Sequence, residues 1–247
     1  MQNQKRKHLP YLQLLSLVVI LISFISCDHH IIKASDEIET KEYNFSNFTS
    51  IEIANDFNAY VHFTDAEESV EIEANSNIFK AIKIEQDGSK LIVKLKNFVT
   101  IHGKETLNVY ISAKEIKKFK VSTDAKIELE NTLVTDKASI EAFADGSFKG
   151  EVMVNDLTLK LTADSKADLF GTAKHVKAKL SADCELRDYD LEIEDLELNL
   201  LADSRAYLTV SNTIDIEAKA GSKFYYKGDA VITRERVNSG SKIIKKE

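Results

Sequence analysis

The sequence predicts an all-β protein built as a parallel β-helix, or solenoid, with coils of about twenty residues each. Three observations predict this fold. Apolar and polar residues alternate from Tyr43 onward, which is the pattern of half-buried strands. One motif returns about every twentieth residue in the second half of the chain, where helical periodicity is absent. The only proline is Pro10, so no proline interrupts the hydrogen-bonded ladders of later strands.

Residues 1–27 are predicted to be a lipoprotein signal peptide. A basic start, Lys5 to Lys7, precedes an apolar stretch from Leu9 to Ile25, and Ser26-Cys27 follows it. Such an order is typical of a secretory signal, and the cysteine resembles that of bacterial lipoproteins, whose thiol accepts a diacylglycerol. Cys27 is therefore the predicted lipidation site, with the membrane as partner. The alternative is an uncleaved anchor helix, for which the stretch is at the short limit.

Both interpretations place the rest of the chain outside the cytoplasm. We expect a lipid anchor on the bacterial outer membrane, with the protein facing the periplasm or the cell surface. Residues 28–42 are polar and are predicted to be a tether, 43–232 the β-helix domain, and 233–247 a basic C-terminal tail.

The net charge of −7 argues against nucleic-acid binding, which requires clustered lysine and arginine. Cys184 is the only cysteine besides Cys27, so lipidation of Cys27 excludes an intramolecular disulfide. We expect Cys184 to be a small core residue and not a nucleophile. A nucleophilic cysteine needs a base beside it, and the nearest histidine in the sequence, His175, is nine residues away.

Strands are expected before the repeat as well. Alternating segments lie at 50–53, 59–63, 70–74, 82–85 and 91–95, and Asp87-Gly88 between the last two predicts a hairpin turn.

The repeat itself has a strand, a tight turn and a second strand in each unit. Its turn position is occupied by Asp124, Asp145, Asp164, Asp183, Asp203 and then Gly221, so that successive markers differ in number by 21, 19, 19, 20 and 18. Positions three and five residues before and after this marker are mainly apolar, so they are expected to fill the interior. An antiparallel sandwich with hairpins of equal length is the alternative, but it does not explain why equivalent positions keep the same character.

Segments 48–75, 83–97, 107–129 and the later Ala-Asp-Ser repeats resemble the putative auto-transporter adhesin, head GIN domain family. The resemblance spans about residues 43–232. It implies a right-handed β-helix in an envelope protein, often a lipoprotein, of Bacteroidetes-type bacteria. No catalytic residues are established for that family, so none is assigned here.

The aspartates of the repeat form a ladder if the coils stack. Two unit charges ~4.8 Å apart repel by about 0.9 kcal/mol even in bulk water. One interpretation is structural, because aspartate tolerates the left-handed turn conformation. The other is a cation ladder, because regularly spaced carboxylates are ligands that Ca²⁺ accepts.

Aromatic residues gather near the C-terminal end of the repeat. Phe224 and Tyr226 occupy inward positions and are expected to cap the last coil. Tyr207 and Tyr225 are candidates for surface recognition of a glycan or an envelope protein.

We therefore expect a non-enzymatic binding, adhesion or structural role without a cofactor. The sequence contains no zinc-ligand spacing, Ser-His-Asp arrangement or glycine-rich phosphate loop. Two alternatives stay open: a carbohydrate-active β-helix enzyme that uses the ladder carboxylates, and a cation-stabilised scaffold.

Overall fold

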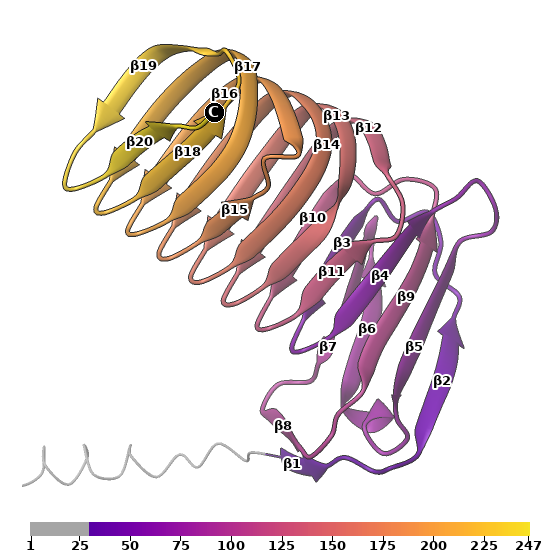
Figure 1. The fold of residues 1–247 in the computed structure, drawn as a ribbon. Coiled ribbons are helices and arrows are strands. Elements are labelled where there is room, and N and C mark those ends of the chain that lie inside the picture. The colour runs from indigo at the N-terminus through magenta and orange to yellow at the C-terminus, as the bar shows by residue number, and fades with distance from the viewer. Residues whose placement is uncertain (1–29) are drawn as a thin grey trace, which may run out of the picture.

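The computed structural model describes residues 30–247, which form an elongated parallel β-solenoid (Figure 1). Eighteen strands join in one sheet, and a single 3-10 helix, η1 (Phe79–Ala81), lies in this part of the chain. The predicted all-β solenoid is confirmed. The predicted signal peptide and its lipidation site, Cys27, lie outside the described residues.

The C-terminal half consists of coils that are each one long strand or two shorter ones. Each strand pairs in parallel with the coils before and after it, so Leu159 lies opposite Ile140 on one side and Ala178 on the other. The numbers of these three residues differ by 19 at each step, as the repeat predicts. The strands are β10 (Lys118–Ser122), β11 (Lys126–Leu129), β12 (Leu133–Phe143), β13 (Ser147–Thr162), β14 (Lys166–Ser181), β15 (Glu185–Arg187), β16 (Leu191–Leu201), β17 (Arg205–Lys219), β18 (Lys223–Lys227), β19 (Val231–Val237) and β20 (Lys242–Lys245).

The interior is filled by the predicted apolar columns. Stacking equivalent side chains from successive coils removes each of them from water, which is the main favourable contribution to folding of such a repeat. Phe119 also packs edge-on against Phe148, with ring centroids 5.2 Å apart. The buried columns before the turn are Phe119, Ile140, Leu159, Ala178, Leu198 and Ile216, and Val121, Ala142, Leu161, Leu180, Leu200 and Ala218.

The tight turns have two consecutive residues with positive φ. The five repeat aspartates have φ of 57–62°, and the residues before them, Thr123 and four alanines, have φ of 48–63°. Positive φ at both central residues is the pattern of a type I′ turn. In the first of these turns the N–H of Ala125 donates to the carbonyl oxygen of Ser122 at 3.3 Å. The preceding residue is small because of this backbone conformation and not because of burial, since none of the five is buried.

The N-terminal part differs from the uniform coil expected from residue 43. β3 (Ser50–Ala54) and β4 (Asn58–Phe63) pair in parallel with β10 and β11 and so form the first coil. On their other side β3 and β4 still pair in parallel, with β7 (Lys90–Leu95) and β9 (Leu107–Ala113). Antiparallel pairing begins beyond these strands, where β6 (Ile82–Asp87) joins β7 and β5 (Ser69–Asn75) joins β9. The predicted hairpin turn at Asp87-Gly88 is confirmed. A solenoid needs such an atypical end, because a regular coil would leave its apolar interior open to water.

The segment expected to be a tether contains two strands. β1 (His30–Lys33) pairs with β8 (Val99–His102) in a separate two-stranded sheet, and β2 (Ile38–Tyr43) pairs antiparallel with β5. The tether prediction is therefore wrong for these residues. β2 looks polar in the sequence because it is an edge strand with mainly exposed side chains.

The C-terminal tail is also ordered into the solenoid. β19 pairs in parallel with β17, and β20 pairs in parallel with β18, so residues 231–245 complete a further coil. Phe224 and Tyr226 point inward, as expected, with their rings stacked 5.4 Å apart. They do not cap the last coil, because β20 continues the solenoid beyond β18.

Candidate functional site

The repeat aspartates line one edge of the solenoid, here called the aspartate edge: Asp124, Asp145, Asp164, Asp183 and Asp203. The main-chain N–H of Asp164 donates to the carbonyl oxygen of Ala182 at 2.9 Å, and that of Asp203 donates to Ala220 at 2.8 Å. Equivalent bonds link each turn to the next coil. The aspartates therefore stack one above another, as the repeat predicts.

The carboxylates of the aspartate edge face solvent. Of the ion pairs within residues 30–247, none includes one of these five aspartates. The same part of the chain contains no group of three or more His, Cys, Asp or Glu side chains arranged to hold a metal ion. The turn conformation accounts for aspartate at these positions, and the cation ladder stays a prediction.

The sequence analysis missed one rung of this edge. Asn55 and Asp56 have φ of 63° and 61°, and the N–H of Asp56 donates to the carbonyl oxygen of Thr123 at 3.0 Å. Partial burial raises the pKa of the Asp56 carboxyl, and the nearby charge of Asp124 raises it further. The signal in the sequence was Ile51-x-Ile53 before Asn55-Asp56, but this unit precedes Asp124 by several coil lengths and so lies outside the regular spacing.

Cys184 lies inside the coil, directly after the turn. Its side chain is 1% exposed, and its Sγ donates to the carbonyl oxygen of Ser181 at 3.1 Å. Ser165, Ser204 and Ser222 occupy the same position in other coils and donate to the equivalent carbonyl, as Ser204 does to Leu201 at 2.8 Å. The Cys184 thiol therefore takes the place of the buried serine hydroxyl of the other coils. Its burial agrees with the expectation of a core residue.

Three tyrosines form a row on the outer surface near the C-terminal end, here called the tyrosine column: Tyr189, Tyr207 and Tyr225. The rings of Tyr207 and Tyr225 are parallel within 3° and stack 4.9 Å apart, and Tyr189 meets Tyr207 edge-on at 6.0 Å. Burial raises the pKa of Tyr207, and the charge of Glu185 raises it further. Because the stacked rings cover each other's faces, they offer their edges and hydroxyls outward and do not form a flat platform for a sugar ring.

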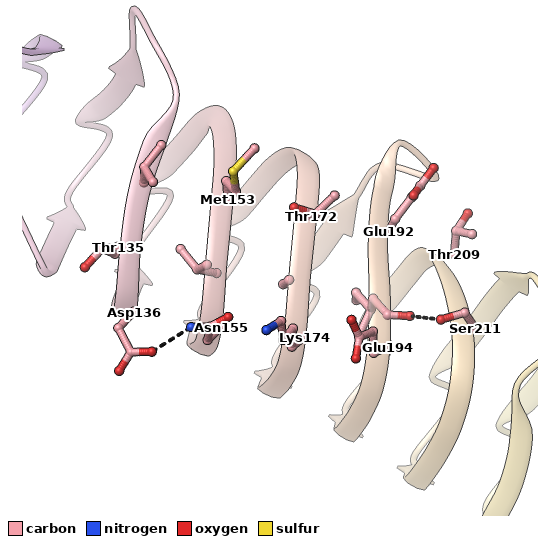
Figure 2. Close-up of a pocket in the computed structure, with 14 residues that line it drawn as sticks. Thr135, Asp136, Met153, Asn155, Thr172, Lys174, Glu192, Glu194, Thr209 and Ser211 are labelled. Carbon is pink, nitrogen blue, oxygen red and sulfur yellow. Dashed lines mark hydrogen bonds between the residues drawn. The ribbon is translucent and has the colours of Figure 1, made fainter.

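A groove runs along the corner where the long strands bend, and it is here called the corner groove. It has a volume of about 730 Å³ and crosses β12, β13, β14, β16 and β17. Figure 2 shows its polar row, in which the Asn155 amide donates to Asp136 at 2.7 Å. Val134 and Met153 also line it and are unusually exposed for apolar side chains, at 67% and 55%.

A second groove of about 700 Å³ is lined by charged side chains from the same strands. Its charges are paired between neighbouring coils: Lys137 with Asp156 at 2.9 Å, Lys177 with Glu197 at 2.7 Å, and His175 with Asp195 at 3.2 Å. A hydrogen bond from Lys137 lowers the pKa of Asp156. Because most of its charged side chains are paired within the protein, this groove offers fewer free charges to a ligand.

Neither groove was predicted from the sequence. Their residues are threonines, asparagines and charged side chains without a motif, and only the coil spacing brings them together. The predicted site residues also lie on separate surfaces, since the aspartate edge is a row of turns and Tyr207 and Tyr225 lie on strands.

Residues 30–247 include no helix of the length and apolar character that crossing a membrane requires.

A family model described as putative auto-transporter adhesin, head GIN domain, matches residues 47–230 of this chain. No curated protein matches it.

Solved structures share the fold. A putative adhesin from Bacteroides fragilis has a TM-score of 0.79 and 17% identity, covering 87% of this chain and 99% of its own. A putative lipid binding protein from Parabacteroides distasonis has a TM-score of 0.74 and 15% identity, covering 88% and 100%. A putative adhesin from Parabacteroides merdae has a TM-score of 0.68 and 16% identity, covering 88% and 100%. At these identities the likeness is one of fold.

Proposed function

Because the chain belongs to the family of the putative auto-transporter adhesin, head GIN domain, we propose that it is a non-enzymatic binding protein of the bacterial cell envelope. Cys27 carries its lipid anchor, and the solenoid presents its outer surface to ligands. Support for the anchor comes from the basic start, the apolar stretch and the Ser26-Cys27 order at the beginning of the chain. Support for binding comes from the corner groove.

We assign ligand binding to the corner groove because two of its apolar side chains, Val134 and Met153, are exposed to solvent. Val134 and Met153 lie opposite each other on neighbouring strands, and Thr172 continues the row. Exposed apolar contacts beside a polar row are common in surfaces that bind extended ligands. The groove is open along the coils, so it suits a chain-like ligand such as a glycan or a segment of an envelope protein.

The binding role is tested with Met153→Glu in the full chain. A charge in the apolar row should weaken saturable binding to envelope glycans and to outer-membrane extract by about tenfold or more. Leu201→Glu is the matched control, because Leu201 is 40% exposed and does not line the groove. Binding that is absent from both materials in the parent protein would contradict the proposed function, and equal loss in both variants would remove the groove from it.

The anchor is tested separately by growing cells that express the full chain with radiolabelled palmitate. The parent chain should be labelled and recovered with the outer membrane. Cys27→Ser should lose the label and leave that fraction. A labelled Cys27→Ser protein would contradict lipidation at this residue.

A further inference from the structure

The outer side of the last strands carries cations around the tyrosine column. Arg205, Lys223 and Lys242 lie opposite one another in register on β17, β18 and β20. On the other side of the column, the Lys227 Nζ lies 5.1 Å from the Tyr189 ring and the Lys246 Nζ 5.5 Å from the Tyr225 ring. We call this surface the cationic face; its charged members are Arg205, Lys223, Lys227, Lys242 and Lys246.

Elsewhere on the same side of the solenoid, charges alternate in sign from coil to coil. The row that leads to Tyr207 consists of Glu128, Lys149, Asp168 and Arg187, and Lys149 pairs with Glu128 at 3.7 Å. In the neighbouring row, Lys166, Glu185 and Arg205 lie opposite one another on successive strands, and the sign of their charges alternates in the same way. Opposite charges on adjacent strands stabilise a sheet, and like charges destabilise it.

The alternation stops at the cationic face. Lys223 and Lys242 follow Arg205 with the same sign, at the strand spacing of about 4.8 Å. Of the ion pairs within residues 30–247, none reaches a charged member of this face. Protection of an open sheet edge accounts for lysine on β20, but it does not account for Lys223, because β18 is paired on both sides.

The cationic face also lies at one particular end of the molecule. β18 and β20 are at the opposite end of the solenoid from β1 (Figure 1). Residues 219–247 contain eight basic and three acidic side chains, a net charge of +5 in a chain whose total is −7. A positive end on an acidic protein attracts an anionic partner from solution.

We propose that the cationic face binds an acidic polysaccharide, a linear glycan with repeated negative groups. Stacked cations supply the partners for these groups, and the tyrosine edges and hydroxyls between them supply contacts for sugar hydroxyls. A membrane site that inserts apolar side chains fits less well, because Ile244 is the one aliphatic residue between the cations in this register. Binding to anionic headgroups by charge alone is distinguished by the vesicle measurement below. The inference rests on the proposed binding role but names a different surface from the corner groove.

The test measures binding of polygalacturonate to the full chain in non-ionic detergent, with uncharged dextran as the neutral comparison. The parent protein should bind polygalacturonate saturably and more weakly as salt increases, and should not bind dextran. Lys223→Gln with Lys242→Gln should weaken binding about tenfold or more. Tyr207→Phe with Tyr225→Phe, which removes two hydroxyls only, should weaken it by a smaller factor.

A matched control is Lys160→Gln with Lys179→Gln. These two lysines also lie opposite each other on neighbouring strands, but on the other side of the aspartate edge, with Glu141 next in their row. This variant has the same net charge as the first and should bind as the parent does.

Three results would overturn the inference: no binding of polygalacturonate at low salt, equal weakening in the two lysine variants, or binding to phosphatidylglycerol vesicles without binding to polygalacturonate. The protein could show no binding to polygalacturonate but still bind envelope material, with that binding weakened by Met153→Glu. In that case this inference is wrong and the proposed function stands.

Discussion

The main-chain N–H of Asp183 donates a hydrogen bond to the carbonyl oxygen of Ala202, one coil further along the solenoid, at 2.9 Å. Both residues have positive φ, at 57° and 52°. This conformation turns the peptide groups of the tight turn along the solenoid axis, so the hydrogen-bonded ladder of the sheet continues through the turn. Aspartate at this position is explained by its tolerance of the left-handed region.

Thr123 is the one β-branched residue among the residues that precede the repeat aspartates. It has φ of 55°, where β-branched side chains are disfavoured and asparagine is tolerated. Thr123→Asn should therefore stabilise the fold by about 1 kcal/mol. Urea unfolding measures the change, and Thr158→Asn on the exposed side of β13 is the control, with no gain expected. A lower urea midpoint for Thr123→Asn would contradict this account of the turn.

Gly171 packs directly beneath the neighbouring coil. A Cβ at this position would lie 2.3 Å from the carbonyl oxygen of Val152, and φ is +101°. Gly171→Ala should cost at least about 2 kcal/mol, because the backbone of β13 has to move. Gly88→Ala is the matched control, since φ there is +58° but nothing lies within 4 Å of the added atom. It should cost only about 1 kcal/mol. Thermal unfolding distinguishes the two, and equal losses would show that contact with Val152 is unimportant.

Cys184 should be replaceable by serine. Cys184→Ser keeps the hydrogen bond to the Ser181 carbonyl and should change the free energy of unfolding by less than about 1 kcal/mol. Cys184→Val removes this bond and adds volume next to the hydroxyls of Ser165 and Ser204, and it should cost about 1–3 kcal/mol. Chemical denaturation of both variants is the measurement. A serine variant as unstable as the valine variant would mean that the hydrogen bond does not explain this position.

Asp56 should make stability depend on pH. Burial and the charge of Asp124 raise its pKa in the folded state, so folding favours the neutral carboxyl. The stability from this group is fully present below the unfolded-state pKa and is lost as the pH rises through the folded-state pKa. Asp56→Asn stays neutral and accepts the same turn conformation.

Asp56→Asn should therefore be more stable than the parent at pH 7, and the difference should vanish near pH 3. Thermal unfolding at both pH values measures it. Asp65→Asn removes the same charge from an exposed loop and controls for the net charge. An Asp56→Asn variant that is less stable than the parent at pH 7 would contradict the raised pKa.

Much of the coil could be predicted from the sequence. Leu159, Leu161 and Asp164 follow a strand–turn pattern that depends only on local conformation and on which side of a strand each residue occupies. The regular spacing then fixes which residues become neighbours. Cys184 was expected to be a core residue because a single cysteine within a strand-like repeat is usually one, and the structure buries it directly after the turn.

The N-terminal end could not be predicted in this way. Ile38 to Tyr43 have few apolar residues, and only the antiparallel pairing with Val70 to Asn75 makes them a strand. Nothing in the local pattern of an edge strand identifies its partner, because the partner supplies the hydrogen bonds.

The sequence by itself determined the period, the inward columns and the conformation of the turns, because each depends on interactions within a single coil and its neighbour. Only the tertiary structure decided how the ends close, where the corner groove runs and that Lys223 meets Lys242. These features depend on which coils come into contact, and stacking converts side chains without any motif into continuous surfaces.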